Sequence, residues 1–172
     1  DMLMCMFIVL ALYTFWQIYT GERDTATARA LFAIYTFLAL FTKGPVGVLV
    51  PIVAVVVFLT LQRDRRTLGK VLGWHFWGIL LVCCAAWWGA VWVEGGEEYL
   101  NNLLFHQTID RAVDAFHHKE PFYYYAITVW YSLAPFSLLA IGAIVAGAFT
   151  RTFDALERLF ATIIVTTFVM LS

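Results

Sequence analysis

Long apolar runs, each close to the length of a membrane-crossing helix, most restrict how this chain can fold. Such runs cover Met2–Thr20, Val71–Val93 and Phe122–Phe149, and another begins at Leu159. A helix that crosses a bilayer needs roughly 20 consecutive apolar residues. Only 13% of the residues are charged, whereas a soluble domain has about a quarter. The sequence therefore predicts an all-α, polytopic integral membrane protein.

Two shorter apolar runs, Ala28–Thr42 and Val46–Leu61, flank the tripeptide Lys43-Gly-Pro45. Gly followed by Pro is a turn signal, so we expect a helical hairpin with its tip at Lys43. Together the runs predict a transmembrane bundle of about six spans. Because the chain starts with Asp1 and its last apolar run continues to Leu171, we expect residues 1–172 to form part of a larger transmembrane domain.

Composition gives no sign of nucleic-acid binding, since the net charge is −1 and the sequence has no basic arm. The three cysteines, Cys5, Cys83 and Cys84, all lie inside apolar runs. Their spacing fits neither a metal site nor a disulfide framework. We interpret them as small apolar residues of the spans.

The distribution of Lys and Arg predicts the orientation of the chain, because basic residues collect in cytoplasmic loops. If Asp1 is outside, the inside loops carry eight basic residues and the outside carries three. The inside set is Arg23, Arg29, Arg63, Arg65, Arg66, Lys70, Arg151 and Arg158, and the outside set is Lys43, Arg111 and Lys119. This orientation places Asp1, Lys43 and the segment 94–120 on one non-cytoplasmic face.

The segment 94–120 is an unusually polar stretch between two spans. Within it, apolar residues recur at helical spacing from Glu97 to about Phe116, which predicts an amphipathic helix at the outer face. An interfacial helix that anchors the protein to lipid is one interpretation. Anchors of that kind are usually rich in Lys and Arg, whereas this segment has a net charge of about −4 before its histidines. A binding or catalytic site is the other interpretation.

Four residues of this outer face are candidates for chemistry, each with a simpler alternative. His106 could ligate a metal through a neutral imidazole nitrogen, or be an unpartnered surface histidine. Arg111 could bind a phosphate through two hydrogen bonds, or pair with Asp110, Asp114 or Gln107. Lys43 could attract a phosphate, or extend its amine from the membrane to the interface. The carboxylate of Asp1 could be functional, or simply begin a span.

Three motifs together resemble the GT-C membrane glycosyltransferases, in particular the branch of the lipid A aminoarabinose transferase and the protein mannosyltransferase-like proteins. They are Thr42-Lys-Gly-Pro-Val-Gly47, Phe105-His-Gln-Thr-Ile-Asp-Arg111 and Phe116-His-His-Lys-Glu-Pro-Phe-Tyr-Tyr124. Asp1 ahead of a span adds to the resemblance, which covers essentially the whole chain as a middle portion of such an enzyme.

The resemblance implies transfer of a sugar from a polyprenyl-phosphate donor to a lipid, glycan or protein acceptor outside the bacterial inner membrane. It implies that Arg111 holds the donor phosphate with support from Lys43. It also implies that His106 ligates a divalent metal, zinc or a similar ion, and that Asp1 is a second acidic residue of the site. The family's principal catalytic carboxylate would precede Asp1.

Two other classes of protein are compatible with the same composition. A transporter would use the polar cluster as a gate or ion site, but ionisable residues would then be expected within the spans. Here the charges gather at one face instead. A non-catalytic membrane subunit could use the amphipathic helix to bind a partner. This interpretation does not explain why Lys43 is predicted to lie on the same face as that helix.

Overall fold

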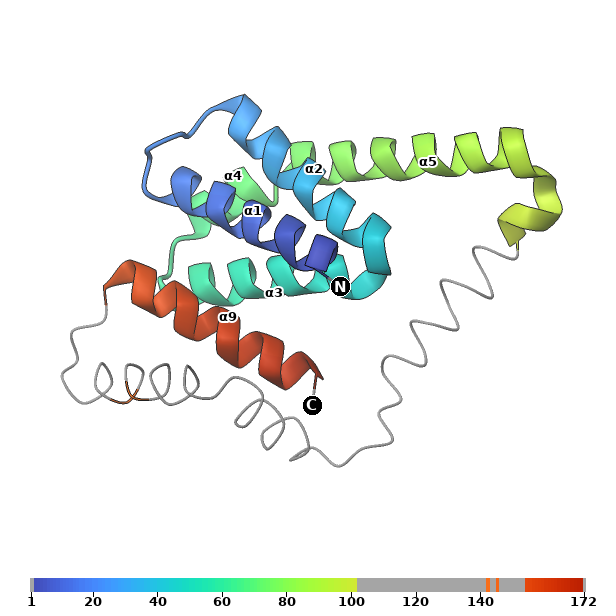
Figure 1. Cartoon of the computed structure of the whole chain (residues 1–172). Helices are drawn as coiled ribbons and strands as arrows, with labels where there is room; N and C mark the ends of the chain where they lie inside the picture. Colours follow the sequence, from blue (N-terminus) through green and yellow to red (C-terminus); the bar gives the residue numbers. More distant parts are fainter. Residues whose placement is uncertain (1, 102–141, 143–144, 146–153, 172) are drawn as a thin grey trace. The chain divides into compact units, whose positions relative to one another are not determined.

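The computed structural model of the chain describes residues 2–101, 142, 145 and 154–171 (Figure 1). The described helices are α1 (Met2–Tyr19), α2 (Ala26–Lys43), α3 (Pro45–Leu61), α4 (Arg65–Val71), α5 (Trp74–Asn101) and α9 (Ala155–Leu171). The described residues contain no strand, so the predicted all-α class is confirmed. The chain divides into two compact units, Asp1–His117 and His118–Ser172. Helices α1–α5 belong to the first unit, and α9 belongs to the second.

Two described stretches are long and apolar enough to cross a membrane, Met2–Tyr19 and Arg65–Val93. The apolar helix Pro45–Leu61 is slightly shorter. At 1.5 Å per residue, the 18 residues of α2 and the 17 of α3 span about 27 Å and 26 Å. Both helices are therefore longer than the apolar runs alone predicted. The six-span count remains a prediction, because much of it concerns residues outside the described ranges.

The segment between α3 and α5 differs from the expectation that its basic residues, Arg63 to Lys70, lie in an inside loop. Residues Arg65–Val71 form the short helix α4 instead. The carboxylate of Asp64 caps this helix by accepting a hydrogen bond from the Thr67 backbone N–H at 3.1 Å. Because a cap satisfies a backbone donor that would otherwise lack a partner, this short basic stretch becomes helical.

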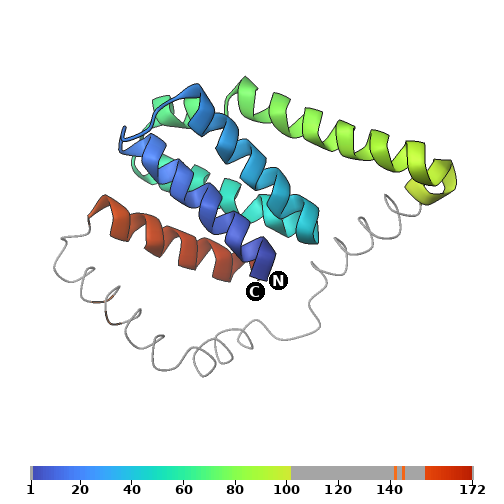
Figure 2. The same ribbon diagram turned by 45° about the horizontal axis from the view of Figure 1, so that its top comes forward.

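Small and aromatic side chains fill the space between α1, α2 and α3, which run side by side (Figures 1 and 2). Five fully buried alanines lie in these three helices: Ala11, Ala28, Ala33, Ala39 and Ala54. Phe58 of α3 meets Phe15 edge-on at a centroid distance of 5.9 Å and Tyr19 at 5.1 Å. Small residues let helix backbones approach closely, which is how helices associate in lipid.

Buried threonine hydroxyls in this core are satisfied within their own helices. Thr14 donates to the Leu10 carbonyl and Thr36 donates to the Phe32 carbonyl, both at 2.8 Å. Each bond spans one helical turn, so these side chains place no unpaired polar group in the apolar interior.

Large apolar side chains lie on the outside of the first unit. On α1, one face at helical spacing is exposed, with Met2 at 91%, Val9 at 63% and Tyr13 at 57% of their full exposure. On α5, Trp74, Leu81 and Val82 are exposed in the same way. A surface of this kind is costly in water and favourable in lipid tails. Small residues inside and large apolar residues outside together indicate helices that are suited to a bilayer.

Candidate functional site

The turn between α2 and α3 forms one end of the first unit, and Lys43 is the last residue of α2 there. Its side chain is exposed. The start of α1 lies at this same end in both views (Figures 1 and 2). The end of the unit that holds Lys43 is called the hairpin end below, and the end that holds the α1–α2 loop and α4 is called the basic end.

The sequence Lys43-Gly-Pro builds the turn through its backbone requirements. Gly44 has φ 83° and ψ −153°, a conformation that residues with a Cβ rarely adopt. Its N–H donates to the Leu40 carbonyl at 2.7 Å and closes the end of α2. Pro45 starts α3 at the first helical position, where its missing N–H costs nothing. The predicted helical hairpin with its tip at Lys43 is therefore present.

Gly47 holds the two arms of the hairpin unusually close together. A Cβ built at this position would clash with the carbonyl oxygen and carbon of Ala39 across the interface. The Thr42 hydroxyl donates to the same Ala39 carbonyl at 2.8 Å. Backbone therefore packs on backbone within one turn of Lys43. This contact fixes the position from which the Lys43 amine extends.

Helix α5 packs against α2 and runs from the basic end toward the hairpin end. Near the start of α5, Phe76 lies 5.4 Å from Phe32. Further along, Trp87 meets Phe41 edge-on with ring centroids 4.5 Å apart, and Phe41 is two residues from Lys43. The later turns of α5 continue beyond α2 (Figure 1). Helix α5 thus extends past the hairpin end of the unit (Figure 1).

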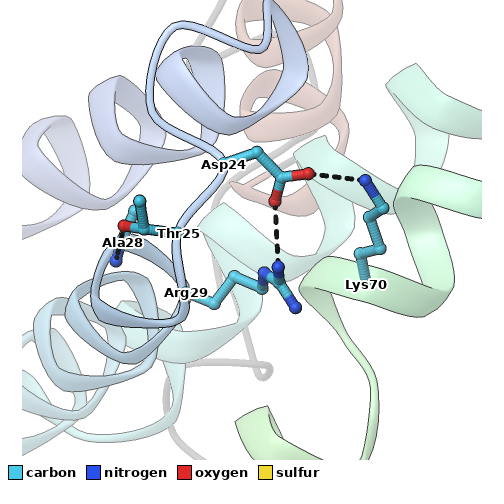
Figure 3. Close-up of polar contacts among 5 residues, drawn as sticks. All are labelled: Asp24, Thr25, Ala28, Arg29 and Lys70. Carbon is cyan, nitrogen blue, oxygen red and sulfur yellow. Dashed lines mark hydrogen bonds and ion pairs between the residues drawn. The ribbon is translucent and has the colours of Figure 1, made fainter.

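The carboxylate of Asp24 forms two ion pairs at the basic end of the unit (Figure 3). Asp24 pairs with the Arg29 guanidinium at 3.2 Å and with the Lys70 amine at 2.5 Å. The next residue, Thr25, caps α2 by accepting a hydrogen bond from the Ala28 N–H at 3.2 Å. Asp24 thus connects the α1–α2 loop with the last turn of α4.

The two cations also change the acidity of Asp24. Hydrogen bonding to Lys70 lowers the pKa of this carboxyl below its ordinary value of 3.8, and Coulombic attraction to Lys70 and Arg29 acts in the same direction. Desolvation opposes the decrease without cancelling it. The Asp24 carboxylate therefore stays ionised at neutral pH, and it neutralises part of the positive charge at this end.

Of the residues predicted for the site, Lys43 is the one that lies within the described ranges. Asp1, His106 and Arg111 lie outside them, as does most of the segment 94–120. Within the described residues, no group of three or more His, Cys, Asp or Glu side chains could hold a metal ion. The proposed metal ligand, His106, lies beyond those residues, so metal binding there remains a prediction.

The sequence did not reveal the Asp24–Lys70 pair or the conformation of Arg63. The sequence partly indicates the interactions of Asp24, because Asp24 directly precedes a capping threonine and Arg29 follows in the first turn of the helix. Nothing in the sequence identifies Lys70, 46 positions away, as its second partner. Arg63 adopts φ 57°, which its side chain alone would not suggest.

Comparison with known proteins gives limited similarity. No family model matches the chain, and no solved structure matches it. A protein of Aquifex aeolicus (strain VF5), described as uncharacterized, is 31% identical over 135 residues. The match covers 77% of this chain and 26% of that protein. The chain thus spans about a quarter of the length of the relative it matches.

Proposed function

We propose that this chain is part of a GT-C type glycosyltransferase that takes its sugar from a polyprenyl-phosphate donor. The reaction would occur at the non-cytoplasmic face of a bacterial inner membrane, with a lipid, glycan or protein as acceptor. The three motifs that resemble this class support the proposal. Further support comes from the apolar outer surfaces of α1 and α5, which suit a lipid environment.

The observation that carries the proposal is the location of Lys43. This lysine is exposed at the tip of a closely packed hairpin, at the end of the unit toward which α5 runs. Six basic residues lie at or near the opposite, basic end: Arg23, Arg29, Arg63, Arg65, Arg66 and Lys70. This asymmetry favours a cytoplasmic basic end and an outer hairpin end.

The proposed chemistry assigns a role to each candidate residue. In the transfer, the bond between the sugar's anomeric carbon and the donor phosphate breaks, and its electrons go to the phosphate oxygen. Arg111 and Lys43 would stabilise the developing negative charge. A carboxylate of the site would accept the proton of a hydroxyl acceptor as it attacks, and Asp1 is the candidate for this role within the chain. A divalent ion held by His106 would supply further positive charge at the phosphate.

Replacing Lys43 in the full-length protein tests this role. In an assay with a polyprenyl-phosphate-linked sugar, Lys43→Ala should lower kcat/KM by about 10- to 100-fold, the usual effect of losing a hydrogen bond to a charged group. Lys43→Arg should recover part of the loss, because it restores the charge with different geometry. Arg66→Ala removes an exposed charge at the basic end and should change turnover by less than about twofold.

A parallel variant tests the predicted partner of Lys43. Arg111→Ala should abolish most turnover if the guanidinium binds the donor phosphate. Full activity of both Lys43→Ala and Arg111→Ala would reject the phosphate site. Solute uptake by reconstituted vesicles, without sugar transfer, would instead support a transporter.

A further inference from the structure

A hollow of about 680 Å³ lies at the basic end, in the corner where α3 passes into α4. Five residues line it: Leu59, Thr60, Arg63, Arg65 and Leu68. One wall is therefore apolar, and two arginines border the same space. Its volume is within the range of about 300–1,000 Å³ that is usual for sites of small organic ligands.

The backbone around Arg63 shows how this arginine reaches the hollow. The Arg63 N–H donates to the Thr60 carbonyl at 3.1 Å, and the Asp64 N–H donates to the Leu59 carbonyl at 3.0 Å. This hydrogen-bond pair is a Schellman motif, in which the residue after the helix cap is left-handed and usually Gly. Here Arg63 takes that position with φ 57°. Arg63 therefore occupies a backbone position that Gly would adopt with less strain.

Two acidic side chains of the basic end already have partners. Asp64 accepts a hydrogen bond from the Thr67 N–H of α4 at 3.1 Å, and Asp24 is paired with Arg29 and Lys70. Within residues 2–93, no ion pair or side-chain hydrogen bond is found for the exposed guanidinium groups of Arg63 and Arg65. Two arginines at one apolar-walled hollow therefore have binding capacity for an anion.

We propose that this hollow binds the phosphate of an anionic membrane phospholipid, such as phosphatidylglycerol, in the cytoplasmic leaflet. Arg63 and Arg65 would bind the phosphodiester, while Leu59 and Leu68 would contact the glycerol and the first acyl carbons. A lipid is favoured over a soluble phosphate, because the hollow lies at the end of the apolar helix α3 and has apolar walls. Basic pockets at the cytoplasmic ends of membrane helices commonly bind such headgroups.

This site is independent of the proposed sugar transfer, since it lies at the opposite end of the unit from Lys43. The test uses the full-length protein in neutral detergent, titrated with phosphatidylglycerol, phosphatidylcholine or glycerol 3-phosphate and examined by native mass spectrometry. One basic residue near an anionic membrane surface changes affinity about fivefold. We expect phosphatidylglycerol to bind at least tenfold more tightly than phosphatidylcholine, and glycerol 3-phosphate to bind weakly.

Variants separate a specific site from a general effect of charge. Arg63→Gly combined with Arg65→Gln should lower the affinity for phosphatidylglycerol at least tenfold. Arg66→Gln removes the same charge from α4 at a residue that does not line the hollow, and should lower the affinity less than twofold. Arg63→Gly alone suits the left-handed backbone, so its weaker binding would not be an effect of unfolding.

Three results would each overturn the proposal. The first is equal affinity for phosphatidylglycerol and phosphatidylcholine. The second is an equal loss of affinity in Arg66→Gln and in the double variant, which would indicate a diffuse charge effect. The third is tight binding of glycerol 3-phosphate, which would identify a soluble phosphate ligand instead of a lipid.

Discussion

A single methyl group added at Gly47 tests whether the close contact between α2 and α3 determines the stability of the hairpin. Gly47 is buried, and a Cβ at this position would meet backbone atoms of Ala39 and Leu40. Backbone atoms cannot rotate away as the end of a flexible side chain can. Gly47→Ala therefore forces the two helices apart or shifts one along the other.

The expected magnitude is the difference between two opposing effects. Replacing Gly by Ala in a helix ordinarily stabilises it by about 1 kcal/mol. Overpacking a closely packed interface costs about 1–3 kcal/mol, and a clash with backbone belongs at the upper end of that range. We expect a net loss of about 1–2 kcal/mol in the free energy of unfolding for Gly47→Ala.

Gly78 provides the matched control, because it also lies in a helix, and a Cβ there would meet no atom within 4 Å. Gly78→Ala should be neutral or stabilising by up to about 1 kcal/mol. Both variants are compared by thermal unfolding of the purified protein in detergent, followed by circular dichroism at 222 nm. The order expected is Gly47→Ala least stable, then wild type, then Gly78→Ala.

Equal unfolding temperatures for the two glycine variants would refute this reasoning, because the clash would then have no energetic consequence. A second measurement connects the contact to the site. If the hairpin positions Lys43, Gly47→Ala should also lower turnover with the lipid-linked sugar at a temperature where the variant remains folded, whereas Gly78→Ala should not.

Two further predictions concern the basic end. Asp24→Asn should lower the free energy of unfolding by about 1 kcal/mol at pH 7, the scale for a partly exposed ion pair. Because the pKa of Asp24 is lowered in the folded protein, this contribution is complete above pH 3.8 and is lost as the pH falls through the folded-state pKa. Unfolding of wild type and variant at pH 7 and at a pH below the folded-state pKa of Asp24 should therefore show a difference only at the higher pH, and a constant difference would contradict the assignment. Arg63→Gly should raise the free energy of unfolding by about 1 kcal/mol because it relieves a left-handed conformation, and denaturant unfolding that shows a loss instead would mean that the arginine stabilises the fold.

Apolar periodicity predicted the described helices well where a run was long and ended at a turn residue. Met2–Thr20 became α1 (Met2–Tyr19), and the Lys43-Gly-Pro tripeptide became the expected tip between α2 and α3. Both predictions rest on local chemistry. The length of the apolar run specifies α1, and a glycine with positive φ followed by a proline specifies the turn between α2 and α3.

The corner around α4 was less predictable, because its structure depends on pairs of residues. Arg63–Lys70 appears in the sequence as a charged loop, and helix α4 forms once Asp64 caps it and Asp24 pairs with Lys70. The expected span from Val71 also starts later, at Trp74, after an interruption at Leu72 and Gly73. Contacts between residues far apart in the sequence decide these helix boundaries, and the spacing of apolar residues does not predict such contacts.

The candidate site could be predicted only as a set of residue types. Lys43 was found because the turn chemistry around it is local, and its exposure agrees with that expectation. The roles of Asp1, His106 and Arg111 come from the resemblance, and they remain predictions. The hollow beside Arg63 had no sequence signal, because it depends on a backbone conformation that is unusual for arginine.

The length of α5 has a consequence for its later turns, which continue beyond the contact with α2. Its 28 residues form one helix with a contour length of about 42 Å, and its last turns bend away from the axis of the earlier ones (Figures 1 and 2). Within a helix, each residue inserted or deleted rotates the turns that follow by about 100° and shifts them along the helix axis by about 1.5 Å. A one-residue insertion after Trp87 would therefore change both the height and the rotation of the turns of α5 that follow the Phe41–Trp87 contact.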